Sequence, residues 1–352
     1  MNRERRKLAK QEKSYTKQIV AAGTCLFALL FLMPLLLYGG EEPSPETPEP
    51  TGSLPLDRVV VTPGGAVDGT TTVRVSLGEG EILSLPMDKY LWRVVAAEMP
   101  ASFEPEALKA QTVAARTYTL VKMEGHSANH PEADVCSDIT CCQAYIDPET
   151  AADRWGSQAE AYSAKIAAAV AGTDGMTALY EGAPIQAVFF SSAAGRTVDA
   201  VEVWGNEVPY LSSVESPEGE EDVPNYHTTV TVSLEEFRNQ MAEQFPQADL
   251  SGEPGGWFAN TVLNSGGGVS TVEVGGVPLR GSELRGMFHL RSSNFTVSAG
   301  AEGVTFSVTG YGHGVGLSQY GANALARQGL AYQDILKWYY SGIEVGVYQR
   351  GE

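Results

Sequence analysis

One acidic side chain closes an otherwise apolar run of the sequence. Residues 93–103 read RVVAAEMPASF, and the acid in this stretch is Glu98. In a helix over about 89–99, Glu98 shares one face with three apolar residues: Leu91, Val94 and Val95. It also lies in the last helical turn, where the helix dipole disfavours negative charge. Burial and dipole both favour the neutral acid and raise its pKa, as general-acid catalysis needs.

The alternative for Glu98 is a structural one. A half-buried glutamate can pair with a cation of the core, and the following helix offers two candidates. Lys109 and Arg116 are seven residues apart and therefore lie on one helical face. From the residues alone, a catalytic acid and a paired core glutamate both remain possible.

A second group of reactive side chains lies in HPEADVCSDITCCQAY, residues 130–145. His130, Cys136 and Cys142 follow one another at intervals of six. Three such ligands suit zinc, with a fourth position open to water or another group. The alternative is a Cys136–Cys142 disulfide, which an extracytoplasmic location permits. Cys141 can replace Cys142 in either scheme.

A glycine-rich loop, GYGHGVGLSQYG, occupies residues 310–321. Its spacing is not that of a nucleotide-binding GxGxxG loop. His313, Ser318 and Gln319 are donors and acceptors suited to a polar ligand with many hydroxyl groups. A plain turn before a helix explains the glycines equally well.

The elements that must position these residues are short strands and alanine-rich helices. We predict helices at 89–99, with Asp88 as N-cap, and at 105–123, with Pro105 in the first turn. Further helices are expected at 151–171, 317–328 and 332–341. Strands are expected at 58–62, 72–77, 81–85, 176–181, 184–190, 226–233, 260–264, 269–280, 294–298 and 303–309. The acidic stretch 216–225 is expected to be a surface loop. The fold class is therefore mixed α+β, a β-rich domain with a helical catalytic core.

The N-terminal part predicts a membrane anchor. Residues 1–18 form a basic tail, and the uncharged run 19–38 is long enough to span a bilayer as one transmembrane helix. Basic residues before the span keep the N-terminus cytoplasmic and place the domain 55–352 outside the cell membrane. A cleaved signal peptide is the alternative. Residues 39–54 are a linker rich in proline and glutamate, and the net charge of -19 excludes nucleic acid as a partner.

Four segments together resemble stage II sporulation protein D: 94–120, 136–145, 189–205 and 310–322. This resemblance implies a lytic transglycosylase that cuts the β-1,4 bond between N-acetylmuramic acid and N-acetylglucosamine in peptidoglycan, leaving 1,6-anhydro ends. It makes Glu98, in AAEMP, the catalytic acid and base. It also implies action on denuded glycan strands during forespore engulfment, beside an amidase resembling stage II sporulation protein P. In some relatives a histidine and two cysteines bind zinc, with the spacing of His130, Cys136 and Cys142.

The resemblance and the polar residues together define the remaining site predictions. The candidate substrate-binding residues are Lys109, Arg116, Ser192, His313, Ser318, Gln319 and Tyr320. The stretch SSAAGR at 191–196 departs from the family pattern, since Ala193 and Ala194 replace polar or glycine positions. Two other functions remain open: a non-catalytic amidase enhancer that binds the wall, and a zinc hydrolase with a metal-bound water.

Overall fold

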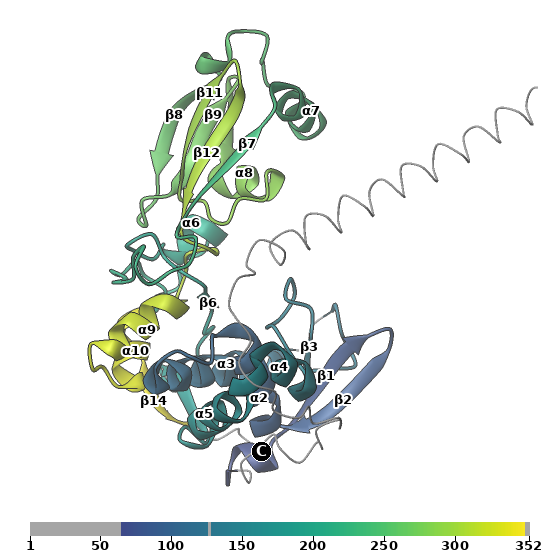
Figure 1. Ribbon diagram of the computed structural model, residues 1–352, viewed down its shortest axis with the longest axis vertical. Helices are drawn as coiled ribbons and strands as arrows, with labels where there is room; N and C mark the ends of the chain where they lie inside the picture. The colour runs from purple at the N-terminus through teal and green to yellow at the C-terminus, as the bar shows by residue number, and fades with distance from the viewer. Residues whose placement is uncertain (1–64, 126–127, 349–352) are drawn as a thin grey trace, which may run out of the picture. The chain divides into compact units, whose positions relative to one another are not determined.

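The structure is a computed structural model that describes residues 65–125 and 128–348 (Figure 1). Four predicted segments lie outside the described residues: 1–18, 19–38, 39–54 and 58–62. Within the described ranges, no helix combines the length and the apolar character that crossing a bilayer requires.

The described chain is a mixed α and β protein, as the sequence predicted. The α-helices are α2 (Met87–Glu98), α3 (Pro105–Gly125), α4 (Pro148–Trp155), α5 (Ala159–Ala171), α6 (Ala200–Trp204), α7 (Leu234–Gln244), α8 (Gly281–Met287), α9 (Gln319–Arg327) and α10 (Tyr332–Tyr339). The strands are β1 (Thr72–Gly78), β2 (Glu81–Pro86), β3 (Val135–Cys136), β4 (Met176–Tyr180), β5 (Ala183–Pro184), β6 (Phe189–Phe190), β7 (His227–Val232), β8 (Phe258–Leu263), β9 (Val269–Val274), β10 (Val277–Arg280), β11 (Phe295–Gly300), β12 (Gly303–Thr309), β13 (Leu317–Ser318) and β14 (Glu344–Val347).

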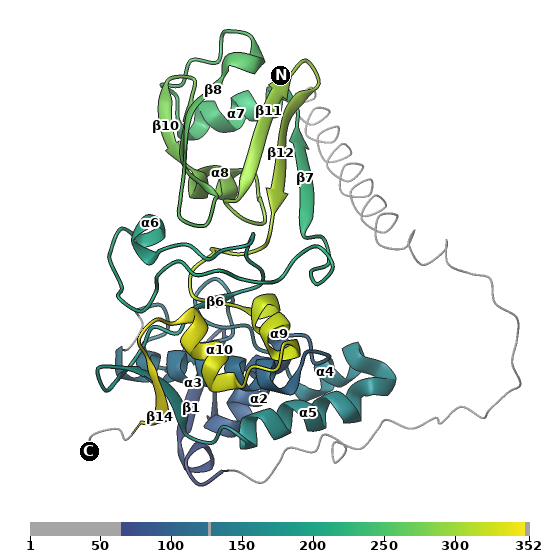
Figure 2. The same cartoon turned by 90° about the vertical axis from the view of Figure 1, so that its left-hand side faces the viewer.

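A helical subdomain surrounds α3, whose alanine-rich sequence lets neighbours approach closely. α2, α5, α9 and α10 all pack against α3, and in Figure 2 the C-terminal helices α9 and α10 lie beside it in yellow. The shared core includes Leu91 and Val95 of α2, Leu108 of α3 and Leu336 of α10. Helices from the early and the late part of the described chain therefore meet around α3.

Small sheets border the helical subdomain. β1 pairs antiparallel with β2 and parallel with β3, so the β3 segment is attached to the first hairpin. β13 pairs in parallel with β6, which joins the start of α9 to the segment after β5. β14, β4 and β5 form a third sheet, in which both strand pairs are antiparallel.

Residues 227–309 form a second core, the β subdomain. It holds two three-stranded antiparallel sheets, ordered β11-β12-β7 and β10-β9-β8, together with α7 and α8 (Figure 1). Stacked aromatic rings fill its core: Phe237 lies parallel to Trp257 and Phe288, at centroid distances of 5.6 and 5.1 Å. The alternation of apolar and polar residues along β12 buries Val304, Phe306 and Val308 in this core.

Two irregular segments, 191–226 and 310–316, connect the helical subdomain and the β subdomain. They are joined through a bridge between Ser192 and Tyr311 and a hydrogen bond from Val198 N to Gly314 O. The acidic stretch 216–225 was predicted to be a surface loop, which is wrong for part of it. Glu218 is only 3 % exposed, because its carboxylate accepts hydrogen bonds from neighbouring segments.

Several predicted element bounds are corrected by the structure. The helix predicted over 151–171 is two helices, because the chain turns at Gly156 with φ +52°. The strand predicted over 184–190 is reduced to β5 and β6, and that over 269–280 breaks between β9 and β10 at Gly275 and Gly276, which have positive φ. Asp88 is not an N-cap, since α2 begins one residue earlier, at Met87.

Candidate active site

Glu98 is the last residue of α2 and lies half-buried beside two hydrogen-bond donors. The backbone N–H of Ala144 donates to its Oε1 at 2.6 Å, and Nε2 of Gln319 donates to its Oε2 at 3.3 Å. The rest of the same face is apolar core, with Leu91, Val94 and Val95 fully buried. The amphipathic pattern of α2 therefore carries one carboxyl group to the edge of the core, as predicted.

Burial raises the pKa of Glu98 above the ordinary range, and the hydrogen bonds from Ala144 and Gln319 offset part of that rise. Neither Lys109 nor Arg116 pairs with it. The structural alternative, a core salt bridge, is therefore wrong for the two cations that the sequence offered. A carboxyl group held by neutral donors can exchange its proton with a bound substrate.

Gln319 and Gln111 place amide groups next to the carboxylate. Gln319 is the first residue of α9, and its Nε2 also lies 3.5 Å from Oε1 of the buried Gln111 on α3. The Nε2 of Gln111 has no hydrogen-bond partner among the described residues. Tyr320 follows with its ring against Phe103, edge to face at 4.9 Å. The structure therefore brings the predicted residue Gln319 to Glu98 and places the predicted residue Tyr320 against Phe103.

Four potential metal ligands gather at the other end of the segment that reaches Glu98. One ligand atom each from His130, Cys136, Cys141 and Cys142 lies within 4.8 Å of all the others. Sγ of Cys142 is 3.3 Å from Nε2 of His130 and 4.0 Å from Sγ of Cys141. No disulfide joins Cys136, Cys141 and Cys142 in the structure.

The chemistry of this donor set fits zinc. Thiolates and imidazole are the usual zinc ligands, and ligand atoms on a tetrahedral zinc lie about 3.3–3.8 Å apart. The carbonyl of Ala133 lies 3.2 Å from Nδ1 of His130, so Nδ1 can donate to it and leave Nε2 free to ligate. The sequence predicted His130, Cys136 and Cys142 as ligands with an open fourth position, and in the structure Cys141 lies in the same cluster as these three.

The cysteine cluster and Glu98 are linked by two intervening residues. Cys142 is followed by Gln143, whose buried amide donates to Thr119 Oγ1 at 3.1 Å and to Tyr90 Oη at 3.3 Å. Ala144 comes next and donates to Glu98. Any interaction that fixes Cys142 therefore also restrains the Ala144 N–H, which donates to Glu98.

Two predicted substrate contacts lie elsewhere. Arg116 is 1 % exposed and forms a bidentate ion pair with Asp68, which holds η2 (Asp68–Thr70) against α3. Lys109 pairs with Glu106 at 2.6 Å, one turn earlier on the same helix. Helical periodicity placed both on α3 correctly, but Lys109 pairs within α3, and the partner of Arg116 comes from another part of the chain.

The glycine-rich loop has a structural reason for its glycines. Gly310, Gly312, Gly314 and Gly316 all have positive φ, and a Cβ at Gly316 would lie 2.2 Å from the carbonyl oxygen of Val188. His313 uses both ring nitrogens on the backbone: Nε2 contacts Phe189 O at 3.1 Å, and Nδ1 accepts from Val315 N at 3.1 Å. Burial lowers the pKa of His313 to about 4. This loop is therefore a close-packed turn with a neutral histidine.

Ser318 and Ser192 are also buried. Ser318 caps α9 by accepting from Gly321 N, and its hydroxyl donates to Glu218. Ser192 is 2 % exposed, and its Oγ has no hydrogen-bond partner among the described residues. Ser318 is thus a structural group, whereas Ser192 keeps an unused polar atom.

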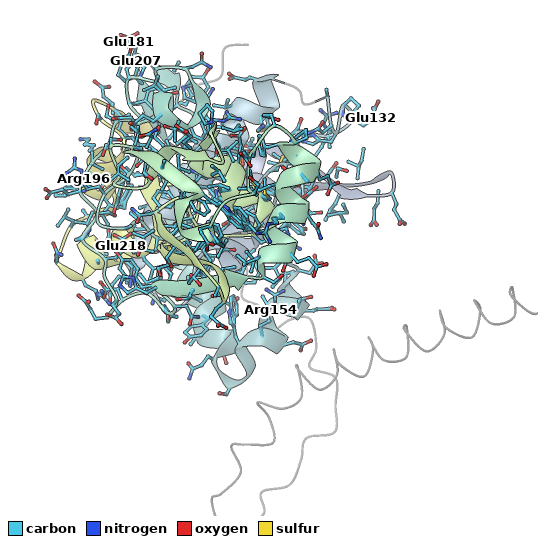
Figure 3. The ribbon with its side chains drawn as sticks, turned by 90° about the horizontal axis from the view of Figure 1, so that it is seen from above. Glu132, Arg154, Glu181, Arg196, Glu207 and Glu218 are labelled. Carbon is cyan, nitrogen blue, oxygen red and sulfur yellow. The ribbon has the colours of Figure 1, made fainter. Side chains whose placement is uncertain are left out.

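Sequence reasoning missed Glu218, which positions part of the site. Glu218 is labelled in Figure 3. Its carboxylate accepts hydrogen bonds from Ala193 N at 2.7 Å, from Ser216 Oγ at 2.6 Å and from Ser318 Oγ. Ser318 directly precedes Gln319. Four acids in a stretch of six residues suggested solvent exposure. Only the burial of Glu218 in the structure distinguishes it from its neighbours.

Comparison with known proteins gives consistent matches. A family model described as "Stage II sporulation protein" matches residues 77–180. Stage II sporulation protein D of Bacillus subtilis (strain 168) is 33 % identical over 338 residues, which cover 94 % of this chain and 96 % of that protein. The protein of the same name from Bacillus amyloliquefaciens is 38 % identical over 263 residues, 74 % of each chain.

A third relative carries a different name. The amidase enhancer of Bacillus subtilis (strain 168) is 29 % identical over 306 residues, which cover 72 % of this chain and 40 % of that protein. The match to the sporulation proteins is closer and spans nearly the full length of one of them. This chain therefore belongs to the stage II sporulation protein D family.

Proposed function

We propose that this protein is a lytic transglycosylase that cuts denuded peptidoglycan strands between N-acetylmuramic acid and N-acetylglucosamine, leaving 1,6-anhydro ends. The observation that carries the proposal is the state of Glu98. A single carboxyl group is held half-buried by neutral donors at the edge of the helical core, and burial raises its pKa. Its motif lies within the segment matched by the family model.

The reaction can proceed with this one carboxyl group. Protonated Glu98 donates its proton to the glycosidic oxygen, and the bond from that oxygen to C1 of the muramyl residue breaks. The C6 hydroxyl of the same sugar then attacks C1. The carboxylate of Glu98 accepts the hydroxyl proton, which restores the acid and closes the 1,6-anhydro ring. Glycoside hydrolysis by water would normally use a second carboxylate.

Neighbouring groups prepare Glu98 for both steps. The Ala144 N–H fixes one carboxylate oxygen, and Gln319 stabilises the ionised state between the two proton transfers. The two nearest acids that follow Glu98 in the sequence have different surroundings. Glu104 has an exposed side chain, and Glu106 pairs with Lys109 and accepts from Tyr332 N.

Zinc is proposed as a structural ion held by His130, Cys136, Cys141 and Cys142. Its positive charge would balance the negative charge of the thiolates, and its bonds to the four residues would fix the segment that ends at Ala144. Four protein ligands leave no position for a metal-bound water. The donor set therefore argues against the third possibility, a zinc hydrolase.

The setting of the enzyme is proposed from the sequence. Residues 19–38 would anchor the chain in the cell membrane, with the N-terminus cytoplasmic and the domain 55–352 outside. An amidase resembling stage II sporulation protein P would remove stem peptides first, during engulfment of the forespore. Family membership supports the sporulation setting.

The second candidate function is a non-catalytic enhancer of an amidase. The relative named amidase enhancer favours it. In that case Glu98 would act as a hydrogen-bond acceptor for a wall saccharide, and its protonation would not matter for function.

The test compares two variants of the full chain on purified denuded glycan strands. Glu98→Gln is expected to lower the cleavage rate by about 10²–10⁴-fold, the usual contribution of a general acid. Glu104→Gln, an exposed acid six residues away, is the matched control and should cleave normally. Near-normal cleavage by folded Glu98→Gln protein would remove the proposed mechanism. No cleavage by the wild type, together with faster amidase turnover in its presence, would identify an enhancer.

A further inference from the structure

A small cavity lies where the two connecting segments meet the β subdomain. Its volume is about 70 Å³, and its wall includes Ser192, Asn294, Arg285 and His313. At roughly 10–15 Å³ for each water position, it holds on the order of five waters. A carboxylate with one or two waters fits this volume.

Arg285 is the cation of this cavity without a carboxylate partner in the described part of the chain. Its Nε donates to Leu290 O at 3.4 Å, and it is half-buried on α8. The two other arginines of the wall are already paired. Arg196 pairs with Glu215, and Arg280 with Glu283.

Among the described residues of the wall, no acid forms an ion pair with Arg285. Burial lowers the pKa of Arg285, but an arginine guanidinium is so strongly basic that it stays charged. His313 faces the same cavity and is neutral at pH 7, since burial and the charge of Arg285 lower its pKa to about 4. Glu202 is the acid of the described wall, and both Ser265 N and Ser265 Oγ donate to its Oε2.

Ser192 adds an unused donor at the same place. It is 2 % exposed, it lines the cavity, and its Oγ has no hydrogen-bond partner among the described residues. A buried hydroxyl without a hydrogen-bond partner destabilises the folded state. An anion between the Arg285 guanidinium and the Ser192 hydroxyl would satisfy both groups.

We propose that this cavity is a subsite for a carboxylate carried by a saccharide, namely the lactyl carboxylate of a peptide-free muramyl residue, with Arg285 as the residue that recognises it. The inference rests on the proposed function. When a stem peptide is attached, the lactyl group is an amide and carries no charge. The subsite would therefore select denuded strands over peptide-bearing ones.

The experiment measures binding, so that cleavage does not interfere. Full-length protein carrying Glu98→Gln is titrated with two glycans of equal length: a peptide-free alternating muramyl oligosaccharide and a neutral N-acetylglucosamine oligosaccharide. Arg285→Gln, Arg285→Lys and the control Arg238→Gln are added in turn. Arg238 belongs to the same subdomain but stacks on Trp257, outside the cavity wall.

The parent protein is expected to bind the muramyl glycan about tenfold more tightly than the neutral glycan, as one charged hydrogen bond provides. Arg285→Gln should abolish this preference and leave neutral-glycan affinity intact. Arg285→Lys should retain most of it, and Arg238→Gln all of it. Esterifying the lactyl carboxylates should have the same effect as Arg285→Gln.

Four results would overturn the inference. The parent protein could show no preference, the preference could survive in Arg285→Gln, or Arg285→Gln could weaken both glycans equally. In the fourth result, a phosphate-bearing wall polymer would displace the bound muramyl glycan at a lower concentration than the esterified muramyl glycan does. If both glycans bind equally while wild-type protein still cleaves strands, the subsite fails and the proposed function stands. Absence of any glycan binding and any cleavage would remove both.

Discussion

At the residue scale, Glu98 lies in an environment that favours its neutral form. Burial raises its pKa, and α2 directs the negative end of its dipole toward it. The folded state therefore binds the proton more tightly than the unfolded chain does. This contribution to stability is complete below the ordinary pKa near 4.5 and is lost as pH rises through the raised pKa of the folded state.

Glu98→Gln is thus expected to become more stable relative to wild type as pH rises. The glutamine resembles the neutral acid at every pH, so the difference in Tm between variant and wild type should be larger at pH 7 than below about pH 4. Thermal unfolding across this range tests the sign. A Tm difference that shrinks with rising pH would mean that burial does not raise the pKa of Glu98.

Gln319 supplies a second residue-scale prediction. Its hydrogen bond lowers the pKa of Glu98, so Gln319→Leu should raise that pKa further. Cleavage requires the protonated acid, and the alkaline limb of the pH–rate profile should therefore move to higher pH. Gln328→Leu, at the exposed far end of α9, is the control and should leave the limb in place. A shift to lower pH would contradict this role.

The sequence identified some of these residues and misplaced others for local reasons. Glu98 was predictable because helical periodicity alone puts it on the face of Leu91 and Val95. The neutrality of His313 was not, because it comes from burial, and the rings against His313 belong to Phe190 and Trp204, more than a hundred residues away. Arg116 was placed on the correct helix, but its partner Asp68 lies 48 residues earlier in the sequence.

At the element scale, the segment from His130 to Ala144 is held by few apolar contacts of its own. We expect one zinc per chain, bound by the four-residue cluster. Cys142→Ser should lose the metal and lower the cleavage rate, because Ala144 would no longer be fixed on Glu98. Elemental analysis and limited proteolysis near 130–142 measure both effects. Metal-free, active protein that is sensitive to reductant would indicate a disulfide instead.

Glu218 connects the irregular 191–226 segment to the start of α9. Glu218→Ala leaves buried donors from Ala193, Ser216 and Ser318 without an acceptor. Each such loss costs about 1–3 kcal/mol, so the free energy of unfolding should fall by at least that amount. Glu220→Ala, an exposed acid of the same loop, should change it by less than about 0.5 kcal/mol. Equal effects in denaturant titrations would show that Glu218 is not a structural anchor.

Long periodic elements were predictable, and short non-local ones were not. The periodicity of 105–123 and 303–309 gave α3 and β12 nearly complete, because each pattern is set by neighbours along the chain. β6 and β13 have two residues each and exist only because they pair with each other across more than a hundred residues. The helices α7 and α8 were missed within a stretch that otherwise alternates like strands.

At the scale of the whole molecule, one helical core brings the two ends of the described chain together. Glu98 comes from α2 and Gln319 from α9, and α3 packs against both helices. The β subdomain adds the wall that contains Arg285. An acid on the helical subdomain and a carboxylate subsite beside the β subdomain together suit a long, charged polymer rather than a small molecule.

The most direct test of the central claim is product analysis of denuded glycan strands cleaved in water enriched in heavy oxygen. Internal attack by the C6 hydroxyl uses no water, so wild-type protein should yield 1,6-anhydro muramyl ends without the isotope, and Glu98→Gln should yield almost none. Reducing ends that carry the heavy isotope would mean that water is the nucleophile and would contradict the transglycosylase account.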